Sequence, residues 1–223
     1  MAVLFNNSII RKTMSITKFT LFEHRLEEKY QALVQKLPEM IKALRLSNSL
    51  EDGKLNKIKE DVYDDLSDSW ETGDFDIKTS SVSVQNQEFK FEKSVAADIM
   101  GTNMSSSLTG DHITLYYAIY TVPYSGKIDT VKYTTTYPKE EVYLTDHGDY
   151  FALTIYSLNP IDKSAEFIKS EKNRILDMIT KNQEANEKYI DSKEDALKDA
   201  IGKEIDFHFK SGHGEISDNN LLL

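Results

Sequence analysis

A long segment in the C-terminal part of the chain, residues 161–201, contains neither glycine nor proline. Its apolar residues recur at steps of three and four, which is the period of one face of an α-helix. A single helix over this range would be about 60 Å long at 1.5 Å per residue, whereas a break at Asp191 and Ser192, where a new N-cap is available, would give two helices. We therefore expect a long C-terminal helix or a helical hairpin that ends at Gly202.

The residues after Gly202 show a different pattern. Apolar and polar residues alternate in Ile205–Phe209, which predicts a short edge strand. The remainder, 210–223, is mostly polar. We expect it to be a flexible tail, because chain ends are ordered only where they are tied down.

The N-terminal region, 15–72, is predicted to form two helices. Apolar residues between Phe22 and Leu44 fall on one helical face, and Pro38 is expected to kink this helix or to start a second piece. A turn at 48–53 separates it from the next helix, and we expect the two to pack as an antiparallel pair. The inward residues of the second helix are Leu55, Ile58, Val62, Leu66 and Trp70.

After the second helix, the period of the hydrophobic pattern changes from 3.6 to 2, which predicts strands. The segment His112–Val122 is apolar or aromatic on both faces, as in a strand covered on both sides. Further strands are expected at 131–137, 142–145 and 150–158, and the short turns between them require antiparallel neighbours. The sequence therefore predicts an α+β fold in which a second region, 73–209, holds an antiparallel sheet of five or six strands and the long C-terminal helix or helical hairpin.

Charge is distributed unevenly along the chain. The 223 residues carry 37 acidic and 27 basic side chains, a formal net charge of −10. Between Glu51 and Asp76, ten acidic residues oppose only three lysines. The ordinary interpretation is a solvated helix face; the alternatives are a docking surface for a basic partner protein, or an acidic mimic of nucleic acid that occupies a basic groove. The candidate partner-binding residues on the outward face of the second helix are Asp61, Asp64, Asp65 and Asp68.

Composition excludes several classes of protein. With no cysteine, the chain has no disulfide, thiolate zinc site or cysteine nucleophile. Its five histidines do not complete a zinc set, so we expect no metal and no cofactor. The acidic balance argues against direct nucleic-acid binding, and the longest uncharged apolar stretch, Ile113–Tyr124, is too short to span a membrane as a helix. The first residues show no secretory signal, so we expect a cytoplasmic protein, and Met14 could equally be the natural start.

One region, between Asp111 and Phe209, resembles a bacterial module. It contains YAIYTVPYSGKIDTVKYTTTYP, then a short strand and YFALTIYSL, then a lysine- and glutamate-rich helical segment. This order is similar to that of an uncharacterised β-meander and long-helix module, which often precedes a restriction-endonuclease-like domain in proteins suspected of anti-phage roles. The resemblance implies a regulatory or sensing module. Its most specific part is the turn with three further candidate partner-binding residues, Tyr124, Ser125 and Gly126.

An enzymatic alternative comes from Asp76 and from Glu88-x-Lys90, twelve residues later. An acidic residue followed by Glu-x-Lys on the next strand could serve a Mg²⁺-dependent nuclease, in which two carboxylates hold the ion and the lysine orients water or stabilises developing charge. Glu60 could be an extra ligand. The same residues are also explained by an alternating strand whose phenylalanines point inward.

These patterns together predict a non-catalytic, cytoplasmic protein-interaction or regulatory module. The resemblance alone adds a role in bacterial or phage defence or counter-defence. The alternatives are the nuclease with Asp76, Glu88 and Lys90, and the acidic nucleic-acid mimic. A homo-oligomer is also expected, because an apolar stripe as long as that of 161–201 is hard to bury within one small domain.

Overall fold

The computed structural model describes residues 18–44, 52–70, 72–101 and 108–219. Within these ranges, the side chains at 44, 52–54, 68–70 and 209–219 are not described. The chain divides into two compact units whose segments interleave, so they do not coincide with the linear division expected at residue 72. Unit 1 comprises Met1–Leu21, Asp76–Ser125 and Lys139–Met178, and unit 2 comprises Phe22–Phe75, Gly126–Pro138 and Ile179–Leu223.

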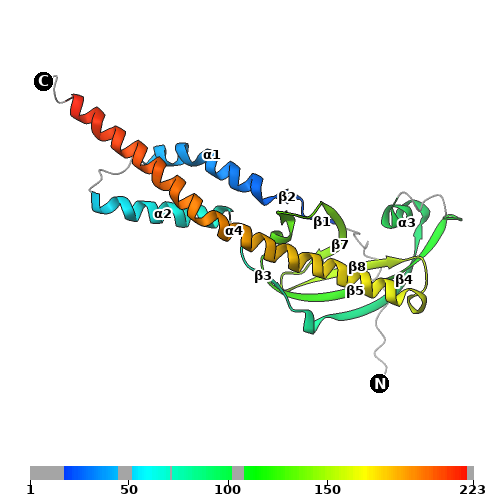
Figure 1. The fold of residues 1–223 in the computed structure, drawn as a ribbon. Coiled ribbons are helices and arrows are strands. Elements are labelled where there is room, and N and C mark those ends of the chain that lie inside the picture. Colours follow the sequence, from blue (N-terminus) through cyan, green and yellow to red (C-terminus); the bar gives the residue numbers. More distant parts are fainter. Residues whose placement is uncertain (1–17, 45–51, 71, 102–107, 220–223) are drawn as a thin grey trace. The chain divides into compact units, whose positions relative to one another are not determined.

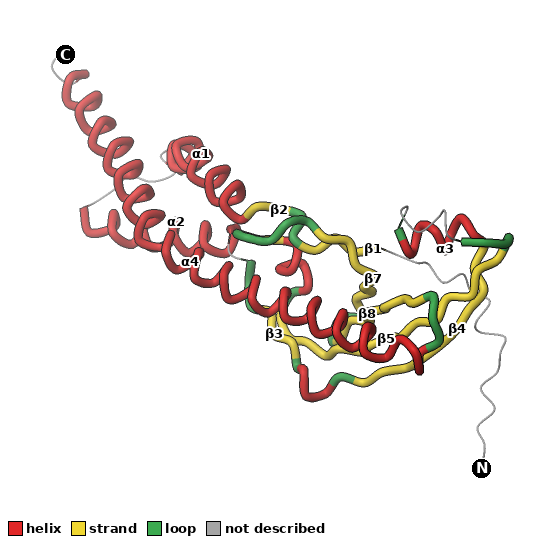
Figure 2. Tube along the Cα trace, turned by 45° about the vertical axis from the view of Figure 1, so that its right-hand side comes forward, coloured by secondary structure: helices red, strands yellow, loops and turns green. Residues whose placement is uncertain are grey.

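Unit 1 is built around an antiparallel sheet, which confirms the predicted α+β class (Figures 1 and 2). Its strands are β1 (Lys18–Leu21), β3 (Phe75–Ile77), β4 (Ser83–Glu92), β5 (His112–Gly126), β7 (Glu140–Asp146) and β8 (Tyr150–Ser157). Their order is β1-β7-β8-β5-β3, and β4 also pairs with β5. The long strand β5 thus has β8 on one edge and β3 and β4 on the other.

Helices lie against both faces of this sheet. Helix α3 (Lys93–Met100) contributes Ala96 and Ile99 to a core that also contains Tyr117 of β5. The first part of α4 (Ile161–Asn219) lies on the opposite face, where the Nζ atom of Lys172 is 5.6 Å from the ring centroid of Tyr120. Side chains at odd and even positions of a strand point to opposite faces, so Tyr117 and Tyr120 mark the two sides of β5.

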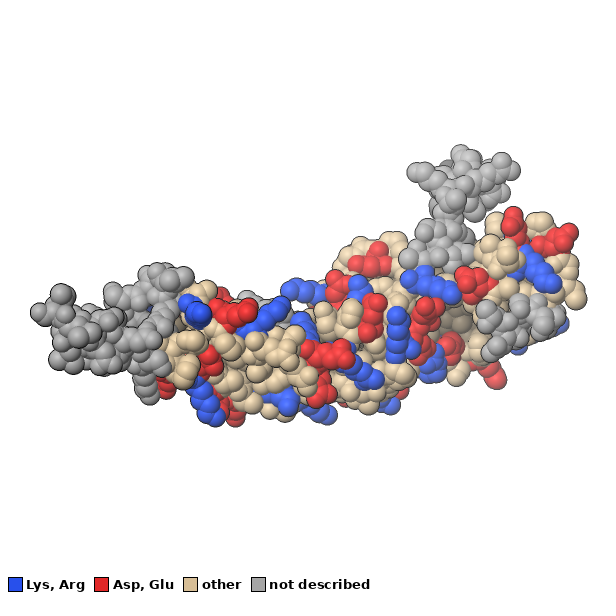
Figure 3. All heavy atoms as spheres, turned by 90° about the horizontal axis from the view of Figure 1, so that it is seen from above, with Lys and Arg blue, Asp and Glu red and all other residues tan. Residues whose placement is uncertain are grey.

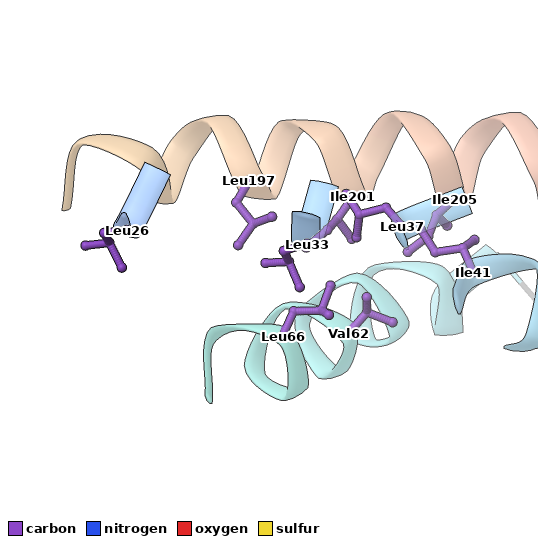
Figure 4. Close-up of a cluster of buried hydrophobic side chains, with 9 residues drawn as sticks. All are labelled: Leu26, Leu33, Leu37, Ile41, Val62, Leu66, Leu197, Ile201 and Ile205. Atoms are coloured by element: carbon purple, nitrogen blue, oxygen red, sulfur yellow. The ribbon is translucent and has the colours of Figure 1, made fainter. Parts of the chain in front are cut away.

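Unit 2 is a bundle of three helices. Helices α1 (Leu26–Leu44) and α2 (Asp52–Trp70) run in opposite directions beside the part of α4 that starts at Ile179 (Figures 1 and 2). All three contribute aliphatic side chains to one core (Figure 4). Its buried members are Leu26, Leu33, Leu37, Ile41, Val62, Leu66, Leu197, Ile201 and Ile205.

The predicted inward face of α2 agrees with this core. Val62 and Leu66 are buried in it, and Leu55 and Ile58 are partly buried against it. The side chain of Trp70, the fifth predicted residue, lies outside the described residues. The period of 3.6 therefore identified the correct face of the helix.

The strand predicted at 131–137 is wrong for most of its length. Residues Ile128–Lys132 form a short 3₁₀ helix, and only β6 (Tyr133–Thr134) is extended, paired in parallel with β2 (His24–Arg25). The hydroxyl oxygen of Thr134 accepts hydrogen bonds from the N–H groups two and three residues later (3.1 and 2.9 Å). Such local bonds compete with strand pairing and turn the chain.

The edge strand predicted at Ile205–Phe209 is also wrong, because α4 continues through Gly202 as far as Asn219. Residues 210–219 of the predicted tail are therefore helical. Leu197, Ile201 and Ile205 follow one another at steps of four, and all three are buried in the core of unit 2. The burial of Ile205 outweighs the cost of a glycine inside a helix, which is about 1 kcal/mol.

The entry to α1 differs from the predicted one. Strand β1 pairs with β7, and the chain then passes through Phe22, whose φ of +57° is the only positive value of a non-glycine residue in the described ranges. The Phe22 ring stacks on Tyr137 at a centroid distance of 5.3 Å. Pro38 lies exposed within a helix that continues past it. No helix within the described ranges combines the length and hydrophobicity that crossing a bilayer would need.

Candidate functional site

The residues of the predicted nuclease site lie at two different places along β5. Glu88 is opposite Tyr116, whereas the residue that follows β3, Lys78, donates its N–H to the carbonyl of Pro123 (2.9 Å). Tyr116 and Pro123 are seven positions apart, which is about 23 Å along the strand at 3.3 Å per residue. Asp76 lies even farther from Glu88 than Lys78 does, because the carbonyl of Asp74 accepts a bond from the N–H of Lys127, beyond Pro123. Carboxylates this far apart cannot share one Mg²⁺ ion.

Lys90 stays near Glu88 on β4, so the structure brings together only the Glu-x-Lys part of the motif. Both side chains are exposed. Across the described ranges, no group of three or more histidine, cysteine, aspartate or glutamate side chains is placed to hold a metal ion.

The turn singled out by the resemblance lies at the end of β5. The side chain of Tyr124 is buried, and its hydroxyl donates a hydrogen bond of 2.7 Å to the carboxylate of Asp146. Ser125 and Gly126 are exposed. Gly126 has a φ of +90°, and a Cβ at this position would lie 1.8 Å from the carbonyl oxygen of Asp74. The tyrosine and the glycine thus have structural roles, which leaves Ser125 as the side chain that a partner could reach.

The outward face of α2 carries exposed carboxylates. Asp61, Asp64 and Asp65 are exposed, and none has an ion-pair partner among the described side chains. Asp61 and Asp65 are neighbours on the helix, and like charges at this spacing destabilise a helix by about 0.2–0.5 kcal/mol per pair. Lys59, on the same helix, instead pairs with Asp206 of α4 at 2.8 Å.

The side chain of Asp68 lies outside the described residues, but the backbone places it in the last turn of α2, where no basic residue is present. A negative charge at the C-terminal end of a helix opposes the helix dipole. The charges of α2 therefore lower the stability of the helix that carries them.

A pocket of about 200 Å³ lies in unit 2 and includes Tyr63 of α2 in its wall. We call it the acidic pocket, because four of its lining residues are acidic. It is lined by Tyr63, Thr72, Gly73, Asp74, Gln183, Glu187, Ile190, Asp191 and Glu194. Its volume is below the roughly 300–1,000 Å³ of typical small-molecule sites, so it suits a single inserted side chain.

The acidic groups of this pocket are only partly neutralised. Glu194 pairs with Lys198 at 2.5 Å, and Glu187 accepts a hydrogen bond of 3.2 Å from Gln183. Asp74 and Asp191 have no cationic partner among the side chains that the structure describes. The pocket therefore favours a cationic group.

Thr72 adds a second polar feature to the wall of the acidic pocket. Its side chain is buried, and its hydroxyl has no hydrogen-bond partner within the described part of the chain. Leaving a buried polar group without a partner costs about 1–3 kcal/mol.

Sequence reasoning missed this pocket for a specific reason. Asp74 falls within the acidic segment that it identified, but Glu187, Asp191 and Glu194 come from α4, whose acidic residues alternate with lysines. Because the acidic and basic residues of α4 balance locally, its sequence does not indicate an acidic site. Only the fold brings one face of it to the end of α2.

A second concavity, of about 280 Å³, lies in unit 1 where the sheet splits. β7 pairs with β8 only from Tyr143 onward, whereas Glu140–Tyr143 pair with β1. The gap that results is lined by both apolar and polar side chains of β7, β8, α3 and α4, among them Ile99, Ile155, Glu140 and Glu171.

The polar groups of this cavity are held in structural contacts. Arg174 binds both Glu171 and Glu140, with contacts of 2.6 and 2.5 Å, and these two carboxylates raise its pKa. The Tyr143 hydroxyl donates to the carbonyls of Asp98 and Ile99 (3.4 and 3.3 Å).

Burial raises the pKa of Tyr143, and burial is also the largest cause of the raised pKa of Tyr156. Both phenols therefore stay neutral near pH 7, where neither can act as a base.

His147 takes part in the hairpin turn between β7 and β8. Its N–H donates to the carbonyl of Tyr150 (3.0 Å), and the two rings stack at 4.6 Å. The neighbouring Asp146 carboxylate accepts bonds from the N–H of Gly148 (2.9 Å) and from Tyr124. These contacts fit the ordinary chemistry of a turn better than a proton relay.

The fold and these sites define an α+β protein with a helical bundle, exposed carboxylates on α2 and an acidic pocket. Comparisons with protein-family models, with curated proteins and with solved structures gave no match. The resemblance to a bacterial module thus remains a prediction from the sequence.

Proposed function

We propose that this chain is a non-catalytic protein-interaction module that binds a basic segment of a partner protein through α2 and the acidic pocket of unit 2. The observation that carries this proposal is the pocket itself. It combines two carboxylates, Asp74 and Asp191, that lack a cationic partner among the described side chains with the buried hydroxyl of Thr72.

The chemistry of the pocket selects the class of ligand. A lysine or arginine side chain would bring a positive charge to Asp74 and Asp191. The exposed carboxylates of α2, Asp61, Asp64 and Asp65, would attract further basic residues of the same segment. Acidic side chains that destabilise their own helix are explained by a surface that is used for binding.

A catalytic function has less support from the geometry. The nuclease motif is not assembled, since Asp76 and Glu88 lie far apart on the sheet. On the sequence resemblance alone, we further propose that the interaction belongs to a bacterial or phage defence system.

A lysine-rich peptide tests the proposal directly. Calorimetric titration at low salt should detect binding that weakens steeply as the salt concentration rises, because exposed charges are screened. Changing Asp74 and Asp191 together to Asn should weaken binding about tenfold, as expected from the loss of charge-assisted hydrogen bonds.

Asp195→Asn is the matched control, because this exposed residue lies on the same helix but does not line the pocket. It should change the affinity less than about twofold. Equal losses in the control and the pocket variant, or no salt-dependent binding of the peptide, would contradict the proposed function.

A further inference from the structure

Among the residues that the structure describes, no strand pairs with the outer edge of β4 over its ten residues. Among the described strands, β4 pairs only with β5, from Ser83 opposite Thr121 to Glu92 opposite His112. Figure 2 shows it along the margin of the sheet of unit 1. A strand in this position presents a row of backbone N–H and C=O groups that can pair with another strand.

This edge also exposes large apolar side chains. Phe89 is 47% exposed and Val84 is 51% exposed, whereas Phe91 is buried under α3. The Phe89 ring contacts the Phe91 ring at a centroid distance of 5.0 Å, so its position is supported from one side. The other side of the Phe89 ring is open to a partner.

The sequence around Phe89 is complementary to itself. If two copies of β4 pair antiparallel about a two-fold axis at Phe89, each Phe89 faces its counterpart and each Glu88 faces a Lys90 of the other copy. Charged side chains usually protect edge strands because like charges would meet. In this register, opposite charges face each other instead, because the two copies form two Glu88–Lys90 pairs, one on each side of the axis.

We propose that a second copy of this chain pairs antiparallel with the open edge of β4, with Phe89 opposite Phe89, to form one continuous sheet across a dimer. Such a pairing is possible whether the central pair is of the hydrogen-bonded or the non-hydrogen-bonded kind. The contact is isologous, so each copy uses the same edge and the assembly closes at two chains.

A cysteine placed on the proposed axis tests the register. Since the chain has no cysteine, Phe89→Cys introduces a single thiol, and opposing Cβ atoms in an antiparallel pair are about 4.5–5.5 Å apart. We expect mild oxidation to convert most of this variant to a disulfide-linked dimer.

Val84→Cys is the control, because it also lies exposed on β4. In the proposed register, the two Val84 positions are about 33 Å apart at 3.3 Å per residue, so the control should not cross-link. Equal cross-linking of both variants would overturn the register.

Charge exchange provides a second measurement that does not involve Phe89. Glu88→Lys or Lys90→Glu alone should weaken the dimer about tenfold in sedimentation experiments, because both symmetric pairs become repulsive. The double variant E88K/K90E should restore the wild-type dissociation constant. Failure of the double variant to restore it, or a wild-type chain that stays monomeric at several hundred micromolar, would overturn the proposal.

Discussion

At the scale of single residues, Gly126 shows how a backbone position can look like part of a binding motif. Its φ is +90°, and the chain around Asp74 passes where a Cβ would be. Gly148 has a similar φ of +92°, but a Cβ there would meet nothing within 4 Å. Substitutions at Gly148 therefore test the cost of the backbone conformation alone, whereas substitutions at Gly126 add the cost of a steric overlap.

We predict that Gly126→Ala destabilises the protein by about 3–5 kcal/mol, which is among the largest effects of single substitutions. Gly148→Ala should cost only about 1–2 kcal/mol, the penalty of a left-handed conformation for a residue with a Cβ. Urea unfolding of both variants measures the difference. Similar losses for the two would show that the chain around Asp74 moves aside.

Asp146 contributes stability that depends on pH. The N–H of Gly148 and the hydroxyl of Tyr124 hold the pKa of its carboxyl below the usual value. A group whose pKa is lower in the folded state stabilises fully above its unfolded pKa of about 3.9 and loses this effect as the pH falls through the folded value.

We therefore expect Asp146→Asn to be less stable than the wild type by about 1 kcal/mol at pH 7, since the amide oxygen accepts the same bonds without charge. The gap should close as the pH falls below about 4. Urea unfolding of both proteins at pH 7, 4 and 2.5 measures this difference in stability. A gap that persists at pH 2.5 would rule out ionisation of Asp146 as its cause.

At the scale of elements, α4 shows that burial overrides a local helix breaker. Gly202 lies between Ile201 and Ile205, which are both in the core of unit 2. A Cβ added at Gly202 would have the end of the Lys59 side chain as its nearest neighbour, at 4.0 Å. The site is therefore able to accept a methyl group.

We predict that Gly202→Ala stabilises the protein by about 0.5–1 kcal/mol, the helix-propensity difference between the two residues. The reciprocal change at an exposed position of the same helix, Ala196→Gly, should destabilise by a similar amount. Thermal unfolding of both variants checks the pair. Destabilisation by Gly202→Ala would mean that the helix is bent or crowded at this point.

Hydrophobic period predicted most of these elements correctly. It identified the inward face of α2, the strand β5 and the strands of the β7–β8 hairpin. It failed at 131–137, where the hydroxyl of Thr134 accepts bonds from two backbone N–H groups and ends the strand. The four-residue strand β1 was also missed, because so short a segment shows little alternation.

The candidate sites depend on information that the sequence does not carry locally. Asp76 and Glu88 are close in sequence, but the register of β4 and β3 on β5 separates them. Asp74 and Asp191 are far apart in sequence, but the fold of unit 2 places both in one pocket. The register of strand pairing separates Asp76 from Glu88, and helix packing brings Asp74 and Asp191 together. Both are long-range properties of the fold.

At the scale of the whole molecule, side chains of both charges share one surface. In the view of Figure 3, acidic and basic side chains alternate over the described residues of that face. The formal net charge of −10 includes the exposed carboxylates of α2, Asp61, Asp64 and Asp65.

The interleaving of the two units also decides which parts of the chain can fold without the others. The core of unit 2 takes Leu197, Ile201 and Ile205 from α4, at the far end of the sequence from α1. The amides of Asn182 and Asn186, also in α4, both donate to the carbonyl of Tyr133 (2.7 and 2.9 Å). Unit 2 therefore cannot be formed by its N-terminal helices alone.

We predict that a chain truncated after Met178 loses the structure of unit 2. Burial of an aliphatic side chain contributes about 1.5–3 kcal/mol, so the loss of Leu197, Ile201 and Ile205 approaches the whole stability of a typical domain. Hydrogen exchange should show α1 and α2 unprotected. The amides of β5 and β8, whose pairing lies within unit 1, should stay protected.

A chain truncated after Phe209 is the control for this experiment, because it keeps every α4 residue of the core. Its α1 and α2 amides should exchange as slowly as those of the full chain. Two helices of 19 residues each have little stability in water without a third surface to bury their apolar faces. If α1 and α2 stayed protected in the chain that ends at Met178, the pair would be stable by itself and α4 would be dispensable for it.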